Sequence, residues 1–250
     1  MLRDIRIPAR FTSTEARYLT LLIRALTRYG LERLTPDEEN ARWAGADWPA
    51  DAETMVGVPR LEQMVEYVTT VVDEGIPGDL AECGSWRGGT CILMAATLDV
   101  LDDTDRTVWC CDSFSGLPKP DPTYPVDNGD VHHTFPELAV PLKTVQANVA
   151  RYGMAHRIDY VQGWFADSLP GPIGPLAILR CDGDMYSSTT QTLTALYPHL
   201  SPGGYCVIDD YAGTDTRGAD RAVHDYRTAH TVTEPIRQGD QRAAAWRHDA

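Results

Sequence analysis

Four aspartates in two short runs are the residues whose type and spacing best suit chemistry. Asp182-Gly183-Asp184 follows the apolar run at 176–181, and Asp209-Asp210 follows a later apolar run at 205–208. If these runs are neighbouring strands, four carboxylates meet at their ends and repel one another unless a counter-charge is present. A hard divalent cation such as Mg²⁺ prefers oxygen ligands and keeps positions for water or substrate. The paired runs therefore predict a metal site, whereas either run alone is typical of a turn or a helix N-cap.

An acid–base role follows from the same cluster. A hydroxyl group beside a divalent cation loses its proton more easily, by the logic that activates metal-bound water. Asp184 is then suited to accept that proton. Histidines offer the alternative base, and His132 and His133 lie together in a long segment that also holds several acids. A solvated polar loop is the more ordinary interpretation of either histidine.

A glycine-rich turn follows the first predicted strand, in the run Glu82-Cys83-Gly84-Ser85-Trp86-Arg87-Gly88-Gly89-Thr90. Its glycines let the chain turn sharply and approach a ligand closely. The spacing departs from G-x-G-x-x-G, so a dinucleotide is not favoured. Glu82, at the strand end, is suited to attract the cationic methionine end of S-adenosylmethionine. A tight strand-to-helix turn without a ligand remains the alternative.

Two further segments extend this binding-site hypothesis. Asp112 lies 28 residues after Gly84, followed by Ser113, and an acid at that separation commonly accepts hydrogen bonds from ribose hydroxyls. The alternative is a helix N-cap, since Asp and Ser both cap well. Gly163-Trp164-Phe165 follows the third predicted strand. Its two aromatic rings suit stacking on adenine or packing in the core, and the sequence leaves both open.

The elements that must position these residues alternate between strand and helix after residue 77. The predicted strands are 78–84, 107–112, 158–162, 176–182 and 205–210, and the predicted helices between them are 88–101, 141–152 and 187–199. This order indicates an α/β protein with a doubly wound, mostly parallel sheet. Ligands in such sheets bind beyond the carboxyl ends of the strands, which is where the chemistry-bearing residues fall.

The residues before this sheet carry helical periodicity and no strand pattern. Residues 14–34 place Leu19, Leu22, Ile23, Leu26 and Leu31 on one face, and 58–74 repeat the pattern. We therefore expect an N-terminal helical cap at 1–75 on the acceptor side and a catalytic core at 76–250. Residues 116–140 hold five prolines and no clear periodicity. A connection of that length is usually functional, so we expect a mobile lid.

Composition narrows the class of partner. The formal net charge is −14 over 250 residues, so the average surface repels phosphate backbones and anionic membranes. Nucleic acid and membrane are therefore not expected as partners. A signal peptide and an apolar stretch of about 18 residues are both absent. The six cysteines match no zinc or disulfide spacing. We expect reduced thiols in a cytoplasmic protein, and a homo-oligomer.

Taken in order, these motifs resemble the macrocin O-methyltransferase family. The resemblance runs from about residue 48 to residue 247, through the glycine-rich turn, Asp105–Phe114, Gly163–Phe165, Asp182–Thr189 and Leu200–Tyr211. It implies a class I methyltransferase (Rossmann-like) fold and S-adenosylmethionine as methyl donor. The acceptor it implies is a sugar hydroxyl of a natural product, as in the macrolides and aminocoumarins that the family methylates.

The resemblance also assigns roles to residues. It implies a Mg²⁺ site at Asp182, Asp209 and Asp210, with Asp184 as the base. Trp48, Met55, Glu137 and Tyr186 are expected to contact the acceptor. The expected cofactor-binding residues are Glu82, Gly84, Ser85, Trp86, Asp112, Ser113, Gly163, Trp164, Phe165 and Asp182.

Two other functions stay open from the sequence. One is an O-methyltransferase for a non-sugar acceptor, such as a catechol or polyketide hydroxyl, since a catechol and a vicinal diol both offer a metal two adjacent oxygens. The other is a non-catalytic cofactor-binding protein, because fold does not fix function. Retention of all four aspartates argues against the second.

Overall fold

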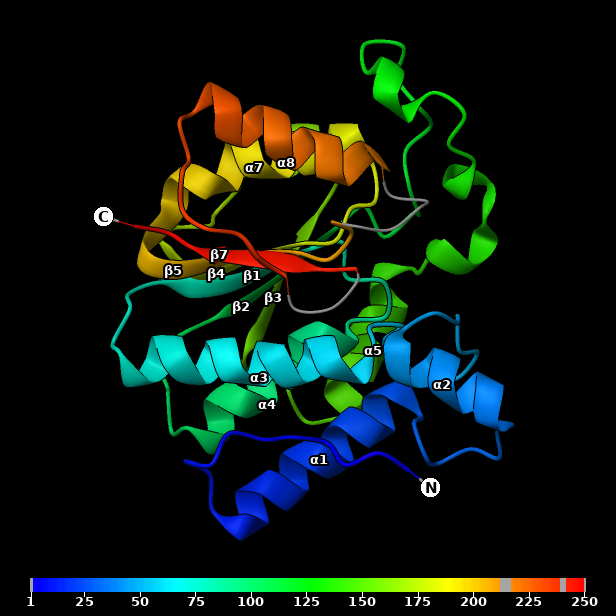
Figure 1. Cartoon of the computed structure of the whole chain (residues 1–250), viewed down its shortest axis with the longest axis vertical. Coiled ribbons are helices and arrows are strands. Elements are labelled where there is room, and N and C mark those ends of the chain that lie inside the picture. The colour runs from blue at the N-terminus through cyan, green and yellow to red at the C-terminus, as the bar shows by residue number, and fades with distance from the viewer. Residues whose placement is uncertain (1, 212–216, 239–241, 250) are drawn as a thin grey trace.

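The protein is built on one twisted sheet with helices on both faces (Figure 1). The computed structural model describes residues 2–211, 217–238 and 242–249. The strands of this part of the chain are β1 (Asp79–Cys83), β2 (Val108–Asp112), β3 (Ile158–Gln162), β4 (Leu176–Cys181), β5 (Leu200–Ile208), β6 (Arg237–Gln238) and β7 (Ala244–Arg247). Their order across the sheet is β3-β2-β1-β4-β5-β7-β6. The first five run parallel and β7 runs antiparallel to β5, so the predicted doubly wound, mostly parallel sheet is confirmed.

Helices form a layer on each face of the sheet. In the described residues they are α1 (Ser13–Thr27), α2 (Pro36–Ala44), α3 (Val58–Asp73), α4 (Gly89–Val100), α5 (Leu142–Arg151), α6 (Phe165–Ser168), α7 (Tyr186–Leu196) and α8 (Arg217–Ala229). Figure 1 shows α1, α3, α4 and α5 on one side of the sheet and α7 and α8 on the other. Successive residues of a strand pack on opposite faces of the sheet: Leu80 belongs to one hydrophobic cluster and Ala81 to the other. The described helices include none that combines the length and apolarity needed to span a membrane.

The N-terminal helices share a core with the sheet. Leu19 of α1 and Leu61 of α3 belong to the same buried cluster as Leu80 of β1. A capping box between Thr12 and Glu15 begins α1. The predicted extension of this helix to residue 34 is wrong, because Arg28 takes a left-handed conformation at the C-cap and ends the helix.

Several boundaries were not foreseen from the sequence. Leu31, expected on the buried face of the first helix, lies beyond its end and is 52% exposed. Strand β5 begins at Leu200 rather than at residue 205. Helix α8 and strands β6 and β7 were not predicted, although Ala219, Ala222, Val223 and Tyr226 of α8 have helical spacing and are buried. Strand β7 is rich in alanine, which favours strands poorly, and pairing with β5 decides its conformation.

The segment 116–140 is tied to the sheet's carboxyl edge. It contains three single-turn 3₁₀ helices and no α-helix or strand. Both carboxylate oxygens of Asp127 accept hydrogen bonds from the first turn of α7, from the N–H groups of Tyr186 at 2.7 Å and Ser187 at 3.0 Å. The indole Nε1 of Trp86 donates to the carbonyl of Glu137 at 2.9 Å. The segment is therefore fixed at two points beside the strand ends.

Gly84 sits where strands β1 and β4 end side by side. Its φ is +92°, a conformation that glycine adopts readily and other residues rarely do. A Cβ atom at this position would lie 1.7 Å from the carbonyl oxygen of Asp182. The close approach of the two backbones thus requires glycine and fixes Asp182 against the glycine-rich turn.

Substitution of Gly84 tests this contact. Gly84→Ala should lower the free energy of unfolding by about 3 kcal/mol or more, because a left-handed alanine and a backbone clash add together. Gly75→Ala is the matched control, since Gly75 has φ +64° and a Cβ there meets nothing within 4 Å. The control should cost about 1–2 kcal/mol. Equal losses in urea unfolding of the two variants would show that the Gly84–Asp182 approach is not restrictive.

Candidate active site

Two cavities meet at the carboxyl edge of the sheet. Leu138, Asp182 and Asp184 line both of them. The first cavity lies over β1, β2 and β3, and the second lies over β4 and β5 and reaches the N-terminal helices. Two ligands bound in these cavities would therefore touch across the same two aspartates. This arrangement suits transfer of a group from one ligand to the other.

The first cavity gathers most of the residues assigned to the cofactor. From that set it is lined by Gly84, Asp112, Ser113, Gly163, Trp164, Phe165 and Asp182. Trp164 is 41% exposed, which is unusual for a large aromatic ring and leaves a face for a ligand. The segment 116–140 contributes the rest of this wall, including Lys119, Asp121 and Tyr124. The sequence predicts no individual role for these three residues, and only their tertiary position brings them here.

Asp112 holds the glycine-rich turn as well as lining this cavity. Its Oδ2 accepts a hydrogen bond from the N–H of Ser85 at 2.8 Å, and its Oδ1 accepts one from the N–H of Phe114 at 2.8 Å. Burial raises the pKa of Asp112, while these N–H groups oppose the shift. The Ser85 hydroxyl also donates to Oδ2 at 3.3 Å and the Ser113 hydroxyl lies 3.5 Å from Oδ1, so a ligand hydroxyl would have to displace one of these weaker contacts.

Glu82, Ser85 and Trp86 are not among the described residues that line either cavity. Glu82 is 1% exposed and accepts hydrogen bonds from Arg180 and from the Cys91 thiol. Burial raises the pKa of Glu82 to about 7, against the attraction of Arg180. In this structure the partner of Glu82 is Arg180 of the neighbouring strand β4, and the contact between Glu82 and the cofactor stays a prediction.

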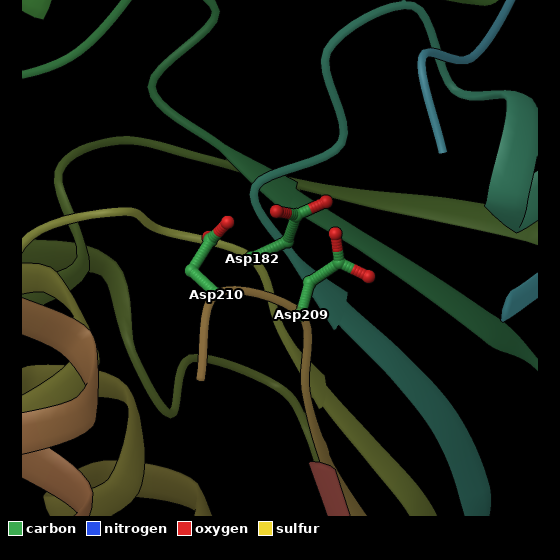
Figure 2. Close-up of side chains that lie close together, drawn as sticks. All are labelled: Asp182, Asp209 and Asp210. Atoms are coloured by element: carbon green, nitrogen blue, oxygen red, sulfur yellow. The ribbon is translucent and has the colours of Figure 1, made fainter. Parts of the chain in front are cut away.

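Asp182, Asp209 and Asp210 lie together at the ends of β4 and β5 (Figure 2). One oxygen of each lies within 4.8 Å of the others. All three line the second cavity, together with Asp184. The predicted convergence of the two aspartate runs therefore holds in three dimensions, and the oxygen-rich set matches the ligands that Mg²⁺ prefers.

Two buried arginines, which the sequence analysis did not single out, bind this cluster. Arg180 of β4 is 2% exposed and donates to Glu82, to Asp182 at 2.8 Å and to Asp209 at 2.5 Å. Arg60 of α3 donates to the other oxygen of Asp209. The sequence feature that could have identified Arg180 is its position as a charged residue in the otherwise apolar run Leu176–Cys181. A buried arginine requires acids around it, because an unpaired buried charge is very costly.

Negative charge still exceeds positive charge around this cluster. Glu82 and the four aspartates bring five carboxyl groups, whereas Arg60, Arg180 and Arg242 are the guanidinium groups that the described residues place beside them. Burial and the neighbouring aspartates raise the pKa of Asp210 well above its usual range. For Asp209, burial is outweighed by Arg180 and Arg60, and its pKa is lowered. The excess negative charge therefore lies on Asp182, Asp184 and Asp210. Carboxylate oxygens with excess negative charge suit a divalent cation.

Asp184 stands between the two cavities in a strained conformation. Its φ is +57°, which is uncommon for a residue with a side chain. Its N–H donates to Asp210 Oδ2 at 3.2 Å. Burial and the charge of Asp182 raise the pKa of Asp184 to about 7. A carboxylate with such a pKa is well matched to proton transfer near neutral pH.

The four residues expected at the acceptor divide into two pairs. Trp48 and Met55 line the second cavity with the aspartates. Glu137 and Tyr186 are not among the described residues that line either cavity. The side chain of Glu137 is exposed, and the Tyr186 hydroxyl donates to Asp225 Oδ2 at 3.1 Å. The segment 116–140 instead presents His132 and Leu138 to this cavity.

Comparisons with known proteins agree with this geometry. The family model described as Macrocin-O-methyltransferase (TylF) matches residues 9–248. The chain is 47% identical over 219 residues to the 8-demethyl-8-(2,3-dimethoxy-alpha-L-rhamnosyl)-tetracenomycin-C 4'-O-methyltransferase of Streptomyces olivaceus, covering 86% of this chain and 82% of that protein. It is 40% identical over 248 residues to the mycinamicin III 3''-O-methyltransferase of Micromonospora griseorubida, covering 93% and 96%.

A solved structure shows the same fold. The O-methyltransferase NovP superimposes with a TM-score of 0.86 at 38% sequence identity, covering 94% of this chain and all of that chain. The class I methyltransferase fold implied by the sequence resemblance is thereby confirmed.

The charge distribution predicts that replacing two adjacent aspartates, Asp209 and Asp210, with asparagine has opposite effects on stability. Asp209→Asn should lower the free energy of unfolding by about 3–5 kcal/mol, because it weakens the partner of two buried arginines. Asp210→Asn should instead stabilise the metal-free protein at neutral pH, since it removes one of the surplus carboxylates while an amide oxygen can still accept from Asp184.

Thermal unfolding with and without Mg²⁺ checks both effects. The wild-type melting temperature should rise with Mg²⁺, and Asp210→Asn should lose that rise because a ligand is gone. Destabilisation by both substitutions, with the Mg²⁺ response intact, would contradict this description of the cluster.

Proposed function

The chain belongs to the macrocin O-methyltransferase family, and from that premise we propose that it methylates a sugar hydroxyl of a natural product, with S-adenosylmethionine as methyl donor. One observation carries the proposal: Asp182 and Asp184 line both the first and the second cavity. The relatives named above act on a tetracenomycin rhamnoside and on mycinamicin III. Both names place the methyl group on a sugar or a primed ring position, which supports the sugar over a catechol.

The donor is proposed to bind in the first cavity. Asp112 would accept hydrogen bonds from the ribose hydroxyls, at the end of β2 where such an acid is expected. Trp164 and Phe165 line the same wall and offer flat apolar surface to the adenine. The sulfonium end of the donor would then lie toward Asp182 and Asp184, where the surplus negative charge attracts a cation.

The acceptor is proposed to bind in the second cavity, between Trp48 and the aspartates. Asp182, Asp209 and Asp210 would hold Mg²⁺ or a similar cation, which would lower the pKa of the sugar hydroxyl beside it. The arginine contacts do not preclude this role, because each carboxylate oxygen has a second lone pair. Arg180 and Arg60 keep Asp209 ionised and fixed, so little reorganisation is needed for binding.

Methyl transfer is an in-line displacement at carbon. The bond between the methyl carbon and sulfur breaks, its electron pair stays on sulfur, and a carbon–oxygen bond forms to the acceptor. Asp184 takes the hydroxyl proton. The donor carries a good leaving group, so alignment of the two ligands and removal of that proton are the tasks left to this chain.

Loss of the Asp112 carboxylate should weaken donor binding. Asp112→Ala is expected to cost about 1–3 kcal/mol in calorimetric binding of S-adenosylhomocysteine, the range for hydrogen bonds to a charged group. Asp159→Ala is the control, because Asp159 is an exposed acid on the neighbouring strand β3. A folded Asp112→Ala protein with wild-type affinity would remove Asp112 from the site.

The catalytic assignment is tested with a mass-spectrometric assay. The donor, Mg²⁺ and a panel of deoxysugar glycosides, with catechols included, should give a product heavier by one methylene group from a glycoside. Asp184→Asn should bind donor normally and turn over about 10²–10⁴-fold more slowly, the usual contribution of a positioned base. Chelation should stop turnover and added Mg²⁺ should restore it. Full activity in excess EDTA would contradict the metal role, and methylation of catechols alone would contradict the sugar acceptor.

A further inference from the structure

The glycine-rich turn after β1 carries two large side chains, Trp86 and Arg87. Neither is among the described residues that line the two cavities. Trp86 has φ +47°, which is uncommon for a residue with a side chain. The guanidinium of Arg87 stacks over the Trp86 ring, with Cζ 4.0 Å from the ring centroid. Because a strained residue persists only when its surroundings hold it, the partners of these two side chains fix the conformation of the turn.

Arg87 binds the connection 45–57 between α2 and α3. This connection contains no helix or strand, so its carbonyl groups depend on donors from elsewhere. Nη1 of Arg87 donates to three of them, those of Pro49 at 3.1 Å, Ala50 at 2.6 Å and Ala52 at 2.8 Å. These residues directly follow Trp48, which lines the second cavity. The glycine-rich turn therefore holds one wall of that cavity in place.

Trp86 binds the long segment that follows β2. Its indole Nε1 donates to the carbonyl of Glu137 at 2.9 Å, and the next residue, Leu138, lines both cavities. Phe135 of the same segment packs edge-on against Trp48, with ring centroids 5.7 Å apart and planes at 67°. The two stretches of chain that the turn holds thus meet each other beside the second cavity.

The same turn forms part of the first cavity. Gly84 lines that cavity, and the N–H and the hydroxyl of Ser85 bind Oδ2 of Asp112 at 2.8 and 3.3 Å. A ribose hydroxyl on Asp112 would displace or share the weaker of these contacts. A donor bound here would therefore contact Gly84 and change the hydrogen bonding of Ser85, the residue directly before Trp86. The turn lies between the donor and both walls of the second cavity.

We propose that Trp86 and Arg87 are positioning residues through which a bound donor orders residues 48–52 and 135–138, and so raises the affinity of the second cavity for the acceptor. The inference rests on the proposed function. The donor favours the conformation of the turn in which Arg87 and Trp86 hold their backbone carbonyls, and this conformation presents Trp48 and Leu138 to the acceptor. By linkage, the acceptor raises the affinity for the donor by the same factor.

Hydrogen exchange with saturating S-adenosylhomocysteine tests this coupling without any acceptor. In the wild-type protein, the amides of 48–52 and 135–138 should exchange about threefold or more slowly when this ligand is bound. Arg87→Met keeps an apolar stem without donors and should lose the slowing at 48–52. Arg87→Lys should restore part of it, because an ammonium group still donates. Arg28→Met is the matched control, since Arg28 donates to the carbonyl of Asp51 at 2.9 Å from the end of α1 and should keep the slowing.

Trp86→Phe separates the two arms of the coupling. It keeps an aromatic ring for Arg87 but loses the indole N–H, so it should lose the slowing at 135–138 and keep it at 48–52. Trp109→Phe is its control, because the Trp109 indole donates to Asp79 of β1 at 2.9 Å, away from the turn. This pair also carries the test if Arg87→Met fails to fold.

Kinetics on a glycoside that the wild-type protein methylates supply the second measurement. Arg87→Met should raise the acceptor KM about tenfold, within the usual range of coupling between two sites, and keep kcat within about threefold. Slowing at 48–52 in Arg87→Met equal to that of the wild type, an equal loss in Arg28→Met, or a loss in kcat alone would each overturn the inference. Those outcomes leave the proposed function intact while the wild-type protein binds S-adenosylhomocysteine and methylates a glycoside. A wild-type protein that does not bind this ligand would contradict the proposed function and the coupling together.

Discussion

A single buried guanidinium group links the ends of three neighbouring strands. Arg180 leaves β4 and binds Glu82 of β1, Asp182 at its own strand's end and Asp209 at the end of β5. At 2% exposure it has little access to water, so its charge depends on these acids and their ionisation depends on it. Replacing any member would leave charge uncompensated in the interior. The carboxyl edge of the sheet is thereby held in one arrangement before any ligand arrives.

This constraint accounts for which acids are left for chemistry. Both oxygens of Asp209 accept from arginines and its pKa is lowered, so Asp209 is the ionised and paired member of the cluster. Asp184 and Asp210 carry the unbalanced charge, and burial raises the pKa of both. Perturbed acids in a cavity are a common mark of function. Here the reason is specific: Arg180 of β4 binds Asp182 and Asp209, and Arg60 of α3 binds Asp209.

The long segment at 116–140 depends on the same corner of the fold. Asp127 accepts from the first N–H groups of α7, the helix that begins just after Asp184. The segment then delivers Leu138 to both cavities and His132 to one of them. Contacts at Asp127 and Trp86 hold it as a wall that the two cavities share. Closure over a ligand would have to move these anchors or the residues between them.

The amino-acid sequence by itself determined the strand–helix alternation, the doubly wound sheet and the gathering of aspartates at its carboxyl edge. Periodicity and turn residues are local signals, and parallel strands bring their ends to one edge regardless of details. The same logic placed Asp112, Gly163 and Trp164 at the first cavity. Local pattern also carried the order of motifs by which the family resemblance was seen.

Only the tertiary structure decided which of these acids face a ligand and which face each other. Glu82 turns inward because Arg180, 98 residues away in sequence, needs a carboxylate on the neighbouring strand. Tyr186 binds Asp225 of α8, a helix that the sequence analysis did not predict. His132 lines the second cavity because Asp127 and Trp86 anchor the segment 116–140 that contains it. Pairings of this kind join residues far apart in the chain, and their energies depend on burial and on net local charge, which spacing along the sequence does not encode.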